Sequence, residues 1–322
     1  SGVSVRAFML DVIIALLPAL VMAVVFFGWN AVRLVTVCVV ACVATEALCR
    51  KLMGRNLAID DLSAALTGLL LAFNLPPALP TWMAVVGSVF AIAVAKQLFG
   101  GIGYNPFNPA LAARVMLLAS FPVPMTRWFA AFHPQRWTAL GWADATTTAT
   151  PLGTVKTALA SGQAIPIEFD AAAFAQYFTG RMGGCIGEVS GLALLIGAAY
   201  LLWRRVINWQ IPTFYIGTVM VFSGLLWVID PQHNMSPLFH LVTGGLILGA
   251  FYMATDMVTT PVTRKGQAAF GIGCGLLTMV IRKWGGYPEG VSFAILLMNA
   301  VSPLINRATR PRLFGRRKKA AA

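Results

Sequence analysis

The stretch AFMLDVIIALLPALVMAVVFF, residues 7–27, decides the fold class of this chain. Asp11 is its one charged residue, and the other positions are apolar apart from a single proline. A helix of about 20 apolar residues is long enough to cross the hydrocarbon core of a bilayer. We therefore predict a transmembrane helix over these residues.

Similar apolar stretches recur along the 322 residues. The candidate spans are 7–27, 32–49, 62–76, 83–99, 109–121, 185–203, 211–229, 237–254, 268–283 and 289–306. The third and fifth are short for a full crossing. Pro76 and Pro77 end the third, because proline lacks an amide proton and clashes with the preceding helical turn. Short or interrupted spans often mark a site inside a membrane protein.

The composition agrees with a membrane protein. Hydrophobic residues make up 58% of the chain and charged residues 11%, whereas about a quarter of a soluble domain is charged. This excludes a disordered chain, a disulfide-rich secreted scaffold and a nucleic-acid-binding domain. We predict an all-α polytopic membrane protein with about ten transmembrane helices.

The net charge of +13 arises from 24 Lys and Arg against 11 Asp and Glu. With the N-terminus in the cytoplasm, sixteen of the 24 basic residues fall on that side, seven of them in the tail 307–322. Lys and Arg accumulate in the cytoplasmic segments of membrane proteins. On a soluble protein this tail would suggest a nucleic-acid-binding arm. Here we predict cytoplasmic termini and a tail that contacts anionic lipid head groups.

A weak internal repeat divides the chain. LTGLLLAF (66–73) is similar to VTGGLILGAF (242–251), and a double-glycine turn follows each, at 100–101 and 285–286. An odd number of spans inverts one half relative to the other, a plan common in transporters. We predict two inverted five-helix repeats, 1–121 and 184–306, separated by a long periplasmic loop, 122–183, and followed by the basic tail, 307–322.

Few residues in the spans carry chemistry. The cysteines lie in or beside apolar stretches without a complete set of metal ligands, so we expect buried, inert thiols and no metal site. Asp11 and Glu46 lie near span ends, where exposure to head groups is expected. Glu188 lies about one turn into the sixth span. Carboxylates inside a membrane usually face a partner or an ion path, so Glu188 is the candidate for an ion path.

The loop 122–183 contains the strongest local signal, DATTTATPL (144–152). Its threonines could simply cap neighbouring backbone groups. The order of residues also resembles the flavinylation motif, in which a flavin transferase moves FMN from FAD onto the last threonine as a phosphoester. That interpretation places covalent FMN on Thr150, with Asp144 as the motif acid and Thr147, Thr148 and Ala149 shaping the loop. Aromatic residues at the start of the loop, Trp128, Phe129, Phe132 and Trp137, are expected to anchor it at the membrane interface.

Three stretches together carry a resemblance to a family: GGIGYNPFNPALAARV (100–115), DATTTATPLG (144–153) and ATDMVTTPVTRKGQ (254–267) leading to GGYPEGVSFAILLMNAVSPLI (285–305). The chain resembles the D subunits of Rnf complexes, the ion-translocating ferredoxin:NAD oxidoreductases. The B subunit of the Na+-translocating NADH:quinone reductase is the alternative. In that protein SGAT usually stands where this chain has TTAT, and the missing glycine is a departure that bears on flavin attachment.

The resemblance implies a subunit of a redox-driven ion translocase in the bacterial inner membrane. Its FMN would relay electrons between ferredoxin and NAD together with Rnf subunits A, B, C, E and G, coupled to Na+ or H+ translocation. The chain shows no iron–sulfur cysteine set and no G-x-G-x-x-G motif opening a βαβ unit. We therefore expect no catalytic residue and no complete active site in this chain alone. A five-plus-five channel or transporter without a redox role is the alternative from another functional class.

The resemblance also allows a second, noncovalent flavin of the riboflavin type near the cytoplasmic side. The loops 100–108 and 256–265 are its expected neighbourhood, since backbone amides and helix N-termini there can meet a polar ring edge. Asn105 and Asn108 could equally be simple helix caps.

Overall fold

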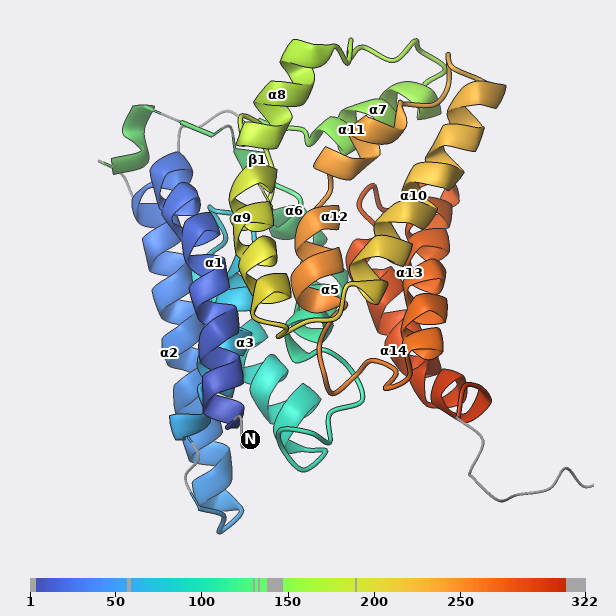
Figure 1. Ribbon diagram of the computed structural model, residues 1–322. Coiled ribbons are helices and arrows are strands. Elements are labelled where there is room, and N and C mark those ends of the chain that lie inside the picture. The colour runs from blue at the N-terminus through green and yellow to red at the C-terminus, as the bar shows by residue number, and fades with distance from the viewer. Residues whose placement is uncertain are drawn as a thin grey trace, which may run out of the picture.

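The computed structural model describes residues 4–56, 59–129, 131–132, 134–137, 147–188 and 190–310. Helices make up most of these residues, and they pack side by side in one bundle (Figure 1). Among the described residues the only strand pairing is a two-residue ladder between β1 (Trp128–Phe129) and β2 (Thr147–Thr148). The helical fold class predicted from the sequence is therefore observed.

A helix lies in each of the ten predicted stretches. In the first half these are α1 (Val5–Phe27), α2 (Trp29–Leu52), α3 (Ser63–Phe73), α4 (Thr81–Val89) continuing as the π-helix η2 (Phe90–Gln97), and α5 (Pro109–Ser120). In the second half they are α9 (Gly191–Trp203), α10 (Gln210–Ile229), α11 (Pro237–Val242), α12 (Leu246–Leu248) continuing as the π-helix η4 (Gly249–Met253), α13 (Arg264–Trp284) and α14 (Val291–Ala308). A 3-10 turn, η1 (Ile59–Asp61), precedes α3.

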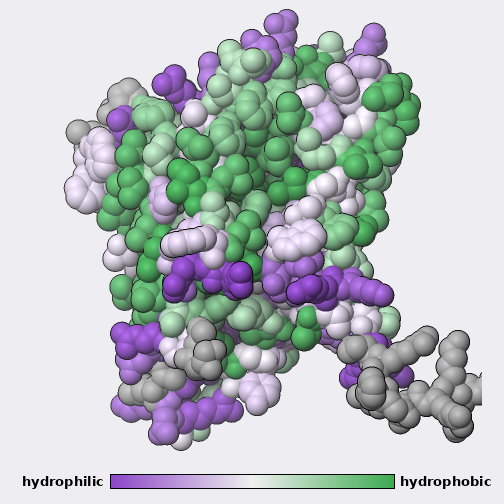
Figure 2. Space-filling model, viewed as in Figure 1, coloured by the Kyte–Doolittle hydropathy of each residue, from purple (hydrophilic) through white to green (hydrophobic). Residues whose placement is uncertain are grey.

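Four of these helices are long and apolar enough to cross a membrane alone: α1, α2, α10 and α14. Their outward side chains are large and apolar, as at Val21, Val40 and Val221, which are each at least 60% exposed. Hydrophobic side chains cover most of the face seen in Figure 2, and hydrophilic ones gather toward its two ends. Such a surface is stable only in an apolar environment such as a bilayer.

The segment between α5 and α9 lies at the upper end of the bundle in Figure 1. Besides the two strands it contains α6 (Pro122–Met125), η3 (Pro134–Trp137), α7 (Pro151–Ala160) and α8 (Ala171–Thr179). Phe132 and Trp137 are exposed, in agreement with a role at the interface, whereas Trp128 and Phe129 are buried. The prediction for those two was wrong, because the ladder with β2 brings them into the protein.

The shorter helices end inside the bundle. α3 ends at Phe73, before the predicted stop at Pro76 and Pro77. The amide of Ile186 donates to the carbonyl of Leu75 at 3.1 Å, and the amide of Gly187 donates to that of Phe73 at 2.9 Å. Irregular backbone at membrane depth needs such partners, because no water is available to satisfy it. The predicted sixth span was wrong at its start, since residues 185–188 form this connection and α9 begins at Gly191.

The predicted exposure of Glu46 was also wrong. Glu46 on α2 is fully buried, and it accepts hydrogen bonds from Lys96 at 2.9 Å and from Gln97 at 2.7 Å. Lys96 donates as well to Ser63 at 2.6 Å. An ion pair taken out of water is tolerated only with such additional hydrogen bonds. Packing of η2 against α2 thus makes Glu46 part of an internal ion pair with Lys96.

Glycines let several helices approach closely, as small residues do in membrane bundles. Gly197 on α9 faces the backbone carbonyl of Ala15 on α1 and the hydroxyl of Tyr252 on η4. A Cβ at position 197 would overlap both groups. Tyr252 also donates to the carbonyl of Leu194 at 2.8 Å, so the three elements meet at this point.

We expect Gly197→Ala to destabilise the protein by about 1–3 kcal/mol, the usual cost of overpacking an interior. The measurement is the thermal unfolding midpoint of the purified protein in detergent. Gly217→Ala is the matched control, because Gly217 lies on the exposed face of α10 with nothing within 4 Å of an added Cβ. Equal midpoints for the two variants would show that close packing at Gly197 is not required.

Candidate functional site

Residues 147–150, which we call the threonine loop, lead directly into α7. Thr148 pairs with Trp128 in the short ladder, and Thr147 pairs with Phe129. Thr150 is the N-cap of α7, where its hydroxyl accepts a hydrogen bond from the amide of Gly153 at 3.0 Å. The capping interpretation of the threonines is therefore confirmed for Thr150. Asp144 lies outside the described residues.

A cavity of about 580 Å³ opens beside Thr150. This volume lies within the ~300–1,000 Å³ range of small-molecule sites. We call it the Thr150 cavity. Its walls come from α5, from the β1 and threonine loops, from α7 and from the turn before α14. Its lining residues are Arg114, Val115, Leu118, Met125, Thr126, Arg127, Trp128, Thr148, Ala149, Thr150, Gly153, Thr157, Tyr287, Pro288, Glu289, Gly290, Ser292 and Phe293.

The chemistry of these walls suits a flavin phosphate. The rings of Tyr287 and Phe293 stack with centroids 5.2 Å apart and offer an aromatic surface. Arg127 is exposed at the wall and has an ion pair with no described residue. The hydroxyl of Thr148 is buried without a hydrogen-bond partner among the described residues. The residues present therefore fit an aromatic ligand with a polar edge and an anionic group.

Lys156 on α7 fixes one wall of the Thr150 cavity. Its ammonium group donates to the backbone carbonyls of Arg282, Gly285 and Tyr287. Burial lowers the pKa of Lys156 below its ordinary value. These bonds tie α7 to the turn before α14, so Thr150 and the pair of aromatic rings are held at the wall of the same cavity.

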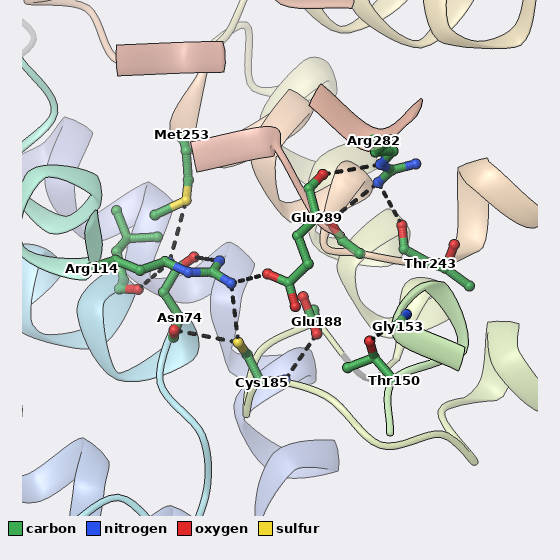
Figure 3. Close-up of polar contacts among 12 residues, drawn as sticks. Asn74, Arg114, Thr150, Gly153, Cys185, Glu188, Thr243, Met253, Arg282 and Glu289 are labelled. Atoms are coloured by element: carbon green, nitrogen blue, oxygen red, sulfur yellow. Dashed lines mark hydrogen bonds and ion pairs between the residues drawn. The ribbon is translucent and has the colours of Figure 1, made fainter. Parts of the chain in front are cut away.

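A buried polar cluster lies behind the cavity (Figure 3). Arg114 on α5 pairs with the carboxylate of Glu289, donates to the side-chain oxygen of Asn74 at 2.8 Å and contacts the sulfur of Cys185 at 3.5 Å. The side chains of Arg114 and Glu289 are 9% and 14% exposed. Because both also line the Thr150 cavity, the cavity and the cluster share a wall.

Glu188, the predicted ion-path residue, belongs to this cluster. It lies in the turn before α9 and is 5% exposed. One carboxylate oxygen accepts from the amide of Cys185 at 2.9 Å, and the other, Oε2, is buried without a partner in the described part of the chain. The predicted placement one turn inside a helix was wrong, while burial inside the bundle is observed.

Arg282 closes the cluster on the side of α13. It donates to the backbone carbonyls of His240, Thr243 and Glu289 at 2.9, 2.9 and 3.0 Å. Thr243 lies where α11 breaks before α12. The guanidinium therefore satisfies carbonyls that the broken helix leaves without a helical partner.

The loops proposed for a second flavin come together at the opposite end of the bundle. They flank a cavity of about 100 Å³, lined by Asn105, Asn108, Asp256 and others. Asn108 caps α5 by accepting from Ala110 and Leu111, so the capping interpretation is confirmed for it. This volume is below the ~300–1,000 Å³ of small-molecule sites. A noncovalent flavin beside these loops stays a prediction.

Sequence reasoning missed most of the polar cluster. No sequence motif assigns a role to Arg114 or to Glu289. A charged residue in an otherwise apolar helix is the signal that could have found Arg114. No local pattern links it to Glu289, which lies 175 positions later.

Comparisons with known proteins agree with the resemblance in sequence. Residues 1–315 match the profile of the NQR2, RnfD, RnfE family. The chain is 50% identical to the D subunit of the Na+-translocating ferredoxin:NAD+ oxidoreductase complex of Acetobacterium woodii, covering 97% of this chain and 91% of the relative. It is 46% identical to the D subunit of the ion-translocating oxidoreductase complex of Stutzerimonas stutzeri, covering 97% and 93%. It is 45% identical to the D subunit of the proton-translocating ferredoxin:NAD+ oxidoreductase complex of Clostridium ljungdahlii, covering 98% and 93%.

Proposed function

The chain belongs to the NQR2, RnfD, RnfE family, and we propose that it carries FMN on Thr150 as the D subunit of an Rnf-type ion-translocating ferredoxin:NAD oxidoreductase. Redox-driven ion translocation follows from its relatives, which are named as subunits of such complexes. The covalent flavin is the finer part of the proposal. It rests on the threonine motif and on the cavity beside it.

One observation carries the covalent flavin: Thr150 lines a cavity of suitable volume and chemistry. A phosphoester on this oxygen would place the phosphate at the N-terminus of α7, where the helix dipole favours an anion. Arg127 can add a positive charge beside it. Tyr287 and Phe293 can hold the flat face of the ring, since aromatic rings favour stacked arrangements.

The protein's contribution is positioning and electrostatics. When bound, the flavin supplies the electron-transfer chemistry. The α7 cap fixes the oxygen that carries it, Lys156 holds α7 against the opposite wall, and Arg114 presents a buried positive charge to the cavity. We propose that electrons pass between this flavin and redox centres of the partner subunits A, B, C, E and G.

The attachment also implies a topology. A flavin transferase must reach Thr150, so we propose that the segment 122–183 faces the periplasm of a bacterium and that both termini face the cytoplasm, with the chain in the inner membrane. We also propose ten spans in two inverted repeats, and the packing of α2 on α4 and η2 corresponds in chain order to that of α10 on α13. The helices α1 and α9, which begin the two halves, pack against each other.

The flavin proposal is tested on the purified wild-type complex. After denaturing electrophoresis, we expect flavin fluorescence in the band of this chain, since a phosphoester survives denaturation. Mass spectrometry should place the added mass of FMN on the proteolytic peptide containing Thr150. Protein produced without the transferase is the control and should show no fluorescence. A wild-type band without flavin, or a modified peptide lacking Thr150, would refute the proposal.

A further inference from the structure

Two buried carboxylates in the polar cluster each have one oxygen without a partner. Oε2 of Glu188 and Oε1 of Glu289 are buried and accept no hydrogen bond from any described residue. The sulfur of Cys185 and one carboxylate oxygen from each glutamate lie within 4.8 Å of one another. In Figure 3 the two carboxyl groups point toward the same space.

The nearby positive charges are already engaged. Arg114 approaches the other oxygen of Glu289, together with Asn74 and Cys185. Arg282 is directed at backbone carbonyls, and the ring of His240 contacts that guanidinium. Glu188 therefore has no ion pair among the described residues. An ionised carboxylate buried in this way costs several kcal/mol of free energy unless a cation accompanies it.

We infer that Glu188 and Glu289 together bind one monovalent cation, a proton or a sodium ion, between their two unpartnered oxygens. This inference rests on the proposed ion-translocating function, and it adds a second residue and a ligand to it. A shared proton would let one carboxyl group donate to the other, as adjacent carboxylates do when both cannot ionise. A sodium ion would take the same oxygens as ligands. The neighbouring guanidinium of Arg114 disfavours a divalent cation at this point.

The local backbone is shaped to admit the carboxylate. Gly245 has a φ of +65°, and a Cβ there would lie 2.8 Å from Oε2 of Glu188. The missing side chain at the break between α11 and α12 thus leaves the space beside that oxygen free. Glu289 also lines the Thr150 cavity, so the site adjoins the space proposed for the flavin. A charge added in that cavity would act on Glu289 and Arg114 at short range.

Infrared spectroscopy of the whole purified complex tests the site. In sodium-free buffer near neutral pH we expect a carboxylic-acid C=O absorption that shifts when glutamate carboxyl groups carry ¹³C. Glu188→Gln and Glu289→Gln should each remove it. Glu168→Gln is the matched control, because Glu168 is exposed in the loop between α7 and α8. The same variants in vesicles should lose ion uptake per NAD reduced, relative to this control.

Following the infrared band while Na+ is added or the pH is raised distinguishes a sodium ion from a proton. Loss of the band on adding Na+ identifies a sodium site, and a band that only alkaline pH removes identifies a proton site. The inference is overturned if the isotope-labelled wild-type complex shows no such band, or if both glutamine variants retain it. A wild-type complex without the band overturns the inference even where a variant fails to assemble. Flavin fluorescence of this chain in a denaturing gel of the same samples tests the proposed flavin on Thr150 separately. The flavin proposal and the cation-site inference can therefore fail independently.

Discussion

Thr150→Val is expected to abolish covalent flavin attachment completely. Valine keeps the branched shape of threonine but lacks the oxygen that would form the phosphoester. The same change removes the hydrogen bond to the amide of Gly153, and loss of an N-cap typically costs about 0.5–2 kcal/mol of stability. The protein should therefore fold, assemble and migrate normally in a denaturing gel without flavin fluorescence. Ferredoxin-dependent NAD reduction by the complex should fall to background.

The matched control for this variant is Thr154→Val. Thr154 lies one helical turn later on α7, and within the described part of the chain its hydroxyl donates only to the carbonyl of Thr150, at 3.2 Å. Thr154→Val also removes a threonine hydroxyl but leaves the proposed attachment oxygen of Thr150 in place. The flavin fluorescence of this variant should therefore persist. Thr150→Ser should retain some attachment, because the oxygen remains. Fluorescence that survives in Thr150→Val would place the flavin on another residue.

Arg114→Met is expected to give the largest loss of stability. Methionine fills similar space but leaves Glu289 buried without its ion pair, and breaking such a pair costs about 3–5 kcal/mol. Asn74 and Cys185 lose a partner at the same time. We expect little assembled complex and a strongly lowered thermal midpoint, measured on detergent-solubilised membranes. The thermal midpoint of Arg114→Lys should lie between those of the wild type and Arg114→Met, since lysine keeps the charge but not the several directed N–H groups.

The double variant Arg114→Met with Glu289→Gln separates charge from packing. Removing both charges should recover much of the stability that Arg114→Met loses, because the carboxylate of Glu289 is no longer buried without its ion pair. Arg181→Met, at an exposed position, is the control and should leave the midpoint unchanged. A midpoint for Arg114→Met equal to that of the control would show that the ion pair does not stabilise the fold.

Local patterns predicted much of the fold. A helix lies in each predicted apolar stretch, because spans are recognised from consecutive apolar residues. The caps at Asn108 and Thr150 follow from short-range chemistry in the same way. Errors came where distant segments decide the outcome. Glu46 is buried because Lys96 and Gln97 reach it from η2, and residues 185–188 leave the helical path because their amides satisfy the end of α3.

The sequence by itself determined that this chain is helical with an apolar exterior, and it singled out Thr150 as the candidate attachment residue. Both depend on neighbouring residues, whose periodicity and order can be read along the chain. Only the tertiary structure decided that Arg114, Glu188 and Glu289 meet behind the Thr150 cavity. Their contacts join segments far apart in sequence, and the packing of α5 against α14 and of residues 185–188 against the end of α3 sets the distances. A buried charge is stable only beside a suitable partner, and tertiary packing determines which residue that partner is. A local sequence pattern therefore does not predict it.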